Sequence, residues 1–152
     1  MRKRGARFNG QRGHVLTPAQ VQKLVTPIHM ALELLPMGLY SEQHGHDLAA
    51  FLNVAQLASD EAGRNDIHDH AHDAAVILLR MRDRARARGQ WNVTTDERTD
   101  LYRHVLAIDK WMRGVSNARW KRALRRVLTI CDTATAEGKQ EMDCIDIGRA
   151  GA

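Results

Sequence analysis

The chain has 152 residues, of which 43% are hydrophobic and 27% charged, the balance of an ordinary globular protein rather than a disordered one. Two cysteines are too few for a disulfide framework or a four-thiolate metal site, and no apolar run is long enough to span a membrane. The basic start is not followed by the apolar segment of a signal peptide, so we expect a cytoplasmic protein with no membrane partner.

The net charge of +5 is unevenly distributed along the chain. Residues 1–16 carry five basic and no acidic side chains, and residues 80–126 carry fourteen basic and five acidic ones. Residues 17–79 and 127–152 are each net acidic. Such segregation favours an anionic partner, whereas the alternative is a solvated surface that the acidic segments balance internally.

Residues 1–16 are predicted to form a flexible basic arm, because basic side chains alternate there with glycines. A helical domain is predicted over residues 17–138. Its first helix begins at the capping box of Thr17 and Gln20 and ends at Pro36. A second helix runs from about Ser41 to Gly63, and a third from Asn65 or Asp66 to Gly89.

A second capping box, in which Thr94 is answered by Glu97, opens a fourth helix that ends at Gly114. Ser116 caps a fifth helix, whose apolar stripe begins at Trp120 and stops before Gly138. Residues 139–152 contain no long periodic segment and are predicted to be a loose C-terminal tail. The fold class predicted is all-α, with about five helices in a compact antiparallel bundle.

The segment from Gly114 to Arg126 resembles the turn and second helix of a DNA-binding helix-turn-helix. Gly114 would adopt the left-handed turn conformation, Val115 would pack inward, and Ser116 would cap the following helix. Lys110 and Arg113 depart from the small and apolar residues usual at their positions in the motif. The alternative is a plain helix hairpin that ends in a capped amphipathic helix, and it fits those departures better.

The candidate nucleic-acid-binding residues lie in three groups. On the fifth helix, Trp120 and Ala123 or Leu124 would pack inward, leaving polar side chains for phosphates and base edges. In the third helix Arg80, Arg84 and Arg88 share one face, although positive charge there is also explained by the helix dipole. Together with the arm, these groups would form one continuous phosphate-binding surface. The set is Arg2, Lys3, Arg4, Arg7, Arg80, Arg84, Arg88, Asn117, Arg119, Lys121, Arg122, Arg125 and Arg126.

Histidine spacing raises the question of a metal site. His68 and His72 lie one helical turn apart, a geometry that can chelate Zn²⁺, and a second group of His44, His46 and Asp47 begins the second helix. In an antiparallel hairpin the two groups lie about 25 Å apart and cannot share a metal. Two ligands alone make a weak site, and such residues also serve as helix caps, so we expect no metal and no cofactor.

The dipeptides His46-Asp47 and His72-Asp73 invite comparison with HD-type metal phosphohydrolases. That pattern also needs an upstream histidine and a distant aspartate, which His29 and Asp109 would nominally supply. The chain is short for that family, and neither an activated nucleophile nor a phosphate-cradling glycine loop is present. We therefore expect that the protein is not an enzyme.

The opening Met1-Arg2-Lys3-Arg4, the segment Leu48–Ala55 and the helix end Ala85–Gly89 resemble a group of short phage and prophage helical proteins. Proteins of this group are often described as Fis-family transcriptional regulators. The resemblance covers about two thirds of the chain and implies a phage origin, which would place the protein in the host cytoplasm.

The leading hypothesis is a small phage-type regulatory protein that binds nucleic acid, DNA in preference to RNA, through a basic face. In this hypothesis Arg119→Ala and Arg122→Ala weaken binding and flatten its salt dependence. The alternative is a protein-interaction module that inhibits a host enzyme complex, such as a polymerase inhibitor or an anti-CRISPR protein. A helical scaffold that assembles with itself is a third class, and the sequence does not set the oligomeric state.

Overall fold

The computed structural model describes residues 14–138, and this part of the chain is helical throughout apart from short connections. The elements are α1 (Pro18–Leu34), the short 3₁₀ helix η1 (Leu35–Met37), α2 (Glu42–Glu61), α3 (Asn65–Arg88), α4 (Thr95–Met112) and α5 (Asn117–Ala136). The predicted all-α fold and its five helices are therefore confirmed. Residues 139–152, predicted to be a loose tail, and residues 1–13 of the predicted arm lie outside the described range.

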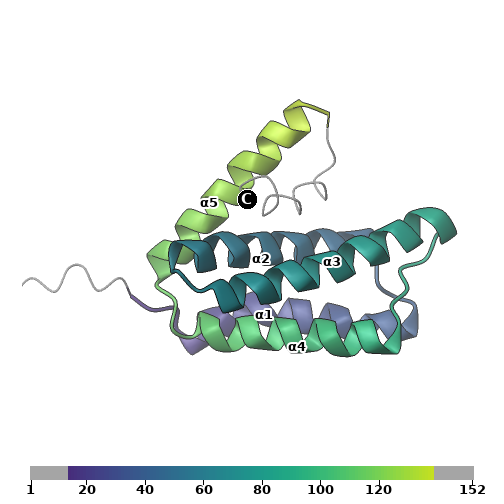
Figure 1. Ribbon diagram of the computed structural model, residues 1–152, viewed down its shortest axis with the longest axis horizontal. Coiled ribbons are helices and arrows are strands. Elements are labelled where there is room, and N and C mark those ends of the chain that lie inside the picture. The colour runs from purple at the N-terminus through teal and green to yellow at the C-terminus, as the bar shows by residue number, and fades with distance from the viewer. Residues whose placement is uncertain (1–13, 139–152) are drawn as a thin grey trace, which may run out of the picture.

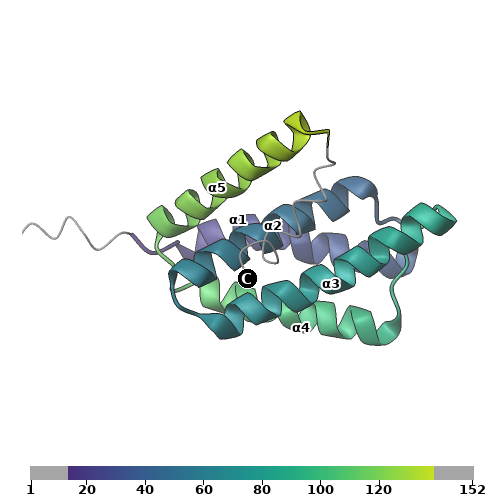
Figure 2. The same cartoon turned by 45° about the horizontal axis from the view of Figure 1, so that its top comes forward.

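Helices α1 to α4 lie side by side with alternating direction, and α5 departs from this bundle at an angle (Figures 1 and 2). The neighbours in the bundle are α1 with α2, α2 with α3, α3 with α4, and α4 with α1. The fifth helix packs against α2, so α2 is covered by three other helices. Among the described helices, none is long and apolar enough to cross a membrane.

The helix starts follow the local cap chemistry that the sequence predicts. Thr17 accepts a hydrogen bond from the Gln20 backbone N–H while the Gln20 side chain accepts one from the Thr17 N–H, and Thr94 and Glu97 repeat this arrangement. The Ser116 hydroxyl accepts from the Arg119 N–H at 3.1 Å, as predicted for the cap of α5. These bonds satisfy backbone donors that would otherwise be unpaired in the first turn.

The core forms where the apolar stripes of the four bundle helices meet. Leu52 from α2, Leu78 and Met81 from α3, and Leu101 and Ile108 from α4 are all inaccessible to solvent. Aliphatic side chains of this kind supply most of the stabilising burial in a bundle. Aromatic residues contribute little to the centre, in agreement with their scarcity in the sequence.

The described end of the predicted N-terminal arm is attached to the turn before α5. The Leu16 N–H donates to the Val115 carbonyl at 2.8 Å, and the Asn117 N–H donates to the His14 carbonyl at 2.7 Å. Val15 and Ser116 form an isolated antiparallel bridge. Leu16, assigned by the sequence to the arm, is buried with 4% of its surface exposed. The chain therefore enters the folded domain directly beside the start of α5.

Candidate nucleic-acid interface

The connection between α4 and α5 differs from a helix-turn-helix in the conformation of its glycine. Gly114 does not have a positive φ, so the predicted left-handed turn is wrong. The turn closes instead through hydrogen bonds from the Gly114 N–H to the Trp111 carbonyl and from the Val115 N–H to the Met112 carbonyl. Val115 is buried, as predicted. Because α5 then packs on α2, the plain connection with a capped amphipathic helix describes this segment better than the motif does.

Replacing Gly114 with alanine is expected to change the free energy of unfolding by less than about 0.5 kcal/mol, because a Cβ there meets only the Trp111 carbonyl at 3.7 Å. The control is Gly89→Ala, where φ is 74° and a side chain is strained, with an expected cost of about 1 kcal/mol. Urea denaturation followed by circular dichroism compares the two variants. If Gly114→Ala lowers the free energy of unfolding as much as Gly89→Ala does, Gly114 has the left-handed conformation of a helix-turn-helix after all.

The first half of α5 presents five basic side chains and no acidic one over residues 117–126. Trp120 and Ala123 face α2 and are buried, whereas Leu124 remains 38% exposed. Of the two inward positions considered beside Trp120, the structure therefore buries Ala123 and not Leu124. The basic residues occupy the remaining surface of the helix. We call this set the α5 basic surface, and it consists of Arg119, Lys121, Arg122, Arg125 and Arg126.

The members of the α5 basic surface differ in how firmly they are held. Arg122 forms an ion pair with Glu61 at the end of α2, and Arg119 lies 4.0 Å from the same carboxylate. Within the described residues, Lys121, Arg125 and Arg126 are exposed and pair with no carboxylate, but Arg126 lines a cleft beside Asp60 and Glu61. Asn117, the remaining candidate on this helix, is half-buried, and its backbone N–H bonds to His14. Lys121 and Arg125 are therefore the cations of α5 most available to an external anion.

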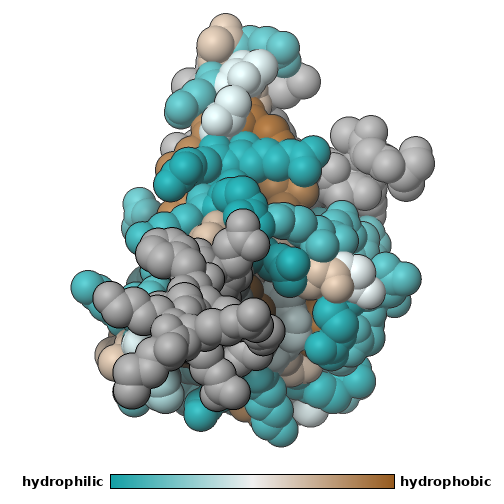
Figure 3. Space-filling view, turned by 90° about the vertical axis from the view of Figure 1, so that its left-hand side faces the viewer, coloured by the Kyte–Doolittle hydropathy of each residue, from teal (hydrophilic) through white to brown (hydrophobic). Residues whose placement is uncertain are grey.

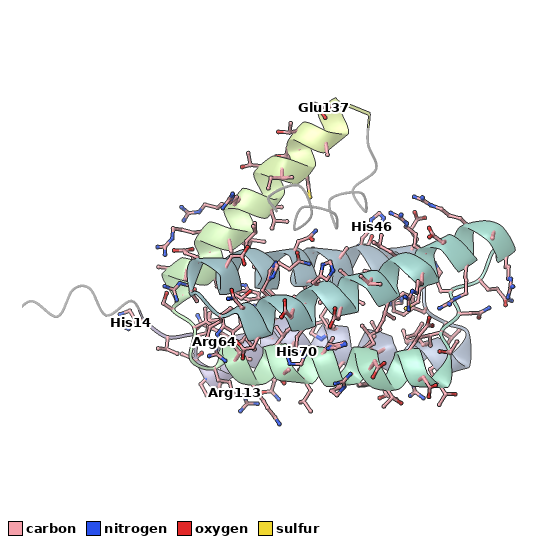
Figure 4. The ribbon with its side chains drawn as sticks, in the orientation of Figure 1. His14, His46, Arg64, His70, Arg113 and Glu137 are labelled. Carbon is pink, nitrogen blue, oxygen red and sulfur yellow. The ribbon has the colours of Figure 1, made fainter. Side chains whose placement is uncertain are left out.

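Other basic groups lie at the end of the molecule where α5 begins. His14, Arg64 and Arg113 all lie at this end (Figure 4). Arg64 is engaged by both oxygens of Asp66, and Arg113 lies 3.9 Å from Asp109. Viewed from the same end, hydrophilic side chains cover much of the surface below α5, while hydrophobic surface is exposed on the flank of α5 itself (Figure 3). The candidate arm residues Arg2, Lys3, Arg4 and Arg7 lie outside the described residues, but the chain that carries them enters at this end.

The structure does not bring the third group of candidate residues to this surface. Arg80 and Arg88 lie about 22 and 35 Å along α3 from its start near Gly114, at the far end of the bundle (Figure 1). The Arg84 guanidinium is already bound within the protein: it pairs with both oxygens of Glu97 and donates to the Asn92 carbonyl at 3.1 Å. This pairing lowers the pKa of the Glu97 carboxyl and stabilises the start of α4. The predicted single continuous surface is thus divided into two separate ones.

The histidines considered for a metal site have other neighbours in the structure. His68 lies 3.8 Å from Asp60 and 3.9 Å from Asp69, and His44 closes the capping box at the start of α2 through its Nδ1. His29 and Asp109 do meet, with 3.6 Å between Nε2 and Oδ2. Across residues 14–138, no group of three or more His, Cys, Asp or Glu side chains is placed to hold a metal ion.

A different histidine pair, which sequence reasoning missed, links α3 and α4. The Nδ1 atoms of His70 and His104 lie 2.9 Å apart, and His104 is buried with 6% of its surface exposed. Burial lowers the pKa of His104, and the charge of Arg103 and the ring of His70 act in the same direction, against Asp73 and Asp100. One ring must donate its Nδ1–H to the other, so the bond exists only while at least one imidazole is neutral. Figure 4 labels His70, which marks the position of this histidine pair.

Comparison with known proteins adds no family to this description. The chain matches no protein-family model, no curated protein and no solved structure. The candidate interface is therefore defined by its own geometry: a basic helix raised from a four-helix bundle, with the N-terminal segment entering beside its first turn.

Proposed function

We propose that the protein binds nucleic acid, DNA in preference to RNA, through the α5 basic surface and the basic N-terminal arm. The observation that carries this proposal is the pairing of His14–Leu16 with Val115–Asn117, which puts the entry of the arm beside the first turn of α5. His14–Leu16, which directly follow the basic arm in sequence, thus lie at the end of the molecule where α5 begins. In this proposal the protein is a small regulatory protein of phage type.

The dimensions of α5 fit a phosphate backbone. Residues 117–126 span about 15 Å along the helix, a length over which two basic side chains can each reach a phosphate of the same strand. Arginine offers a fork of donors to phosphate oxygens, and lysine a point charge. The fifth helix departs from the bundle at an angle (Figure 2), and the side chains of Lys121 and Arg125 are exposed on it, where a rod-shaped partner can reach them.

The double substitution Lys121→Ala/Arg125→Ala is expected to weaken duplex DNA binding about tenfold and to lower the salt slope by about 2, as two phosphate contacts are lost. These residues test the surface more sharply than Arg119 and Arg122, whose replacement also removes ion pairs with Glu61. The measurement is fluorescence anisotropy with a labelled duplex across a salt series.

The matched control is Arg80→Ala/Arg88→Ala, which removes the same two positive charges at the far end of the bundle. We expect its affinity to stay within about twofold of the parent protein, because long-range attraction between exposed charges is screened within about 10 Å at 0.1 M salt. Equal losses in the two double variants would mean that net charge, and not the α5 basic surface, controls binding.

A further inference from the structure

The middle of α5 and the first half of α2 enclose a groove that the four-helix bundle does not fill. Its volume is about 170 Å³, and its wall on α5 consists of Leu124, Val127, Leu128 and Cys131. On α2 the alanines Ala49 and Ala50 form the floor, and Gln43, His46, Asp47 and Asn53 form a polar margin. Leu128 is 53% exposed and Leu124 38% exposed, one helical turn apart. Two aliphatic side chains left in water beside an alanine floor form an apolar surface suited to covering by another segment.

A buried polar atom in the same groove has no hydrogen-bond donor among the described residues. Asn53 lines the groove and has 2% of its surface exposed, yet within residues 14–138 no donor bonds to its Oδ1 atom. A buried acceptor without a donor costs free energy, so an occupant that supplies an N–H is favoured over a purely apolar one. A peptide segment offers both apolar side chains and backbone N–H groups.

The chain itself supplies such a segment at the open end of the groove. After α5 the chain leaves at Gly138, whose φ of 78° turns it away from the helix axis, and fourteen residues follow, 139–152. Among them Met142, Cys144, Ile145 and Ile147 form the apolar part of the segment. Cys131 lies about 10 Å and Leu124 about 21 Å back along α5 from Gly138. Nine extended residues span about 30 Å, so residues 142–147 can reach the whole α5 wall.

We propose that the groove between α2 and α5 binds the chain's own C-terminal segment through Met142–Ile147. A tether this short gives the segment an effective concentration in the millimolar range, which a second copy of the chain does not reach in dilute solution. The docked segment covers Leu124 and Leu128 and holds this part of α5 against the bundle. This proposal stands independently of nucleic-acid binding.

The test uses the thiol of Cys131, in the groove wall, as a reporter in the full-length chain carrying Cys144→Ser. Addition of Ile145→Asp/Ile147→Asp is expected to raise the rate of Cys131 alkylation by iodoacetamide about tenfold, because reactivity follows the fraction of time that the groove is open. Hydrogen exchange of the α5 amides from Leu128 onward is expected to accelerate in the same variant. The matched control, Ala150→Asp/Ala152→Asp, adds the same charge beyond the apolar residues and is expected to leave both rates unchanged.

Equal alkylation rates in the Cys144→Ser parent and the Ile145→Asp/Ile147→Asp variant would overturn the proposal. Light scattering of the parent protein provides a second criterion, with a monomer expected. A dimer that Leu128→Asp converts to a monomer would also overturn the proposal, because a second copy would then occupy the groove.

Discussion

Replacing Trp120 with alanine is expected to lower the free energy of unfolding by about 3–5 kcal/mol, the range found for buried aromatic residues. Trp120 is 5% exposed, and its ring centroid lies 6.2 Å from that of Phe51 on α2. It is the largest buried side chain described on α5, where Ala123 and Val127 are also buried. Urea denaturation followed by circular dichroism measures the loss.

Trp120→Phe is the matched control, since it keeps an aromatic ring against Phe51 and is expected to cost about half as much or less. Hydrogen exchange locates the damage: the α5 amides should lose protection first, while α2, α3 and α4 keep theirs. If Trp120→Ala costs less than about 1 kcal/mol, α5 is not anchored on α2 in the way the structure shows.

Acidification is expected to destabilise the protein through the pair of His70 and His104. Because burial lowers the pKa of His104 below its ordinary value of 6.5, the unfolded chain binds more protons than the folded one as the pH falls through that value. The free energy of unfolding therefore falls on going from pH 7.5 to pH 5.5. The loss amounts to about 1.4 kcal/mol for each unit by which the pKa is lowered, and it stops growing below the folded-state pKa.

The comparison is between the parent protein and His104→Gln, in which the group at position 104 no longer titrates. Denaturant midpoints measured from pH 7.5 to 5.5 should fall steeply for the parent and more gradually for the variant. The charged and titratable neighbours of His104 are present in both proteins, so they contribute alike to both pH profiles. These neighbours are His70, Asp73, Asp100 and Arg103. Parallel pH profiles would show that His104 is protonated as readily in the folded state as in the unfolded chain.

The helices were predictable because their boundaries are set by neighbouring residues. Thr17 with Gln20 and Thr94 with Glu97 satisfy backbone donors within three residues, so the chemistry of each start is complete in the local sequence. The apolar stripe of the fifth helix likewise predicted that Trp120 and either Ala123 or Leu124 pack inward, and Trp120 and Ala123 are buried. Ends at Gly63, Gly89 and Gly138 were predicted for the same local reason.

The placement of functional groups was less predictable because it depends on how the helices pack. Nothing near Gly114 in the sequence specifies that α5 crosses to α2, and that crossing separates the α5 basic surface from Arg80 and Arg88. The contact of His70 with His104 joins residues 34 positions apart and depends on the register of α3 against α4. One signal was available: His104 follows Leu101 by three residues on the buried stripe of α4.

Fluorescence anisotropy of the 152-residue chain with labelled duplex DNA, single-stranded DNA and RNA over a salt series tests directly whether the protein binds nucleic acid. We expect submicromolar binding to duplex DNA at low salt, weaker binding to the other two, and an affinity that falls steeply as salt is raised. Absence of binding to all three at low salt would contradict this expectation and would make the α5 basic surface a site for a protein partner.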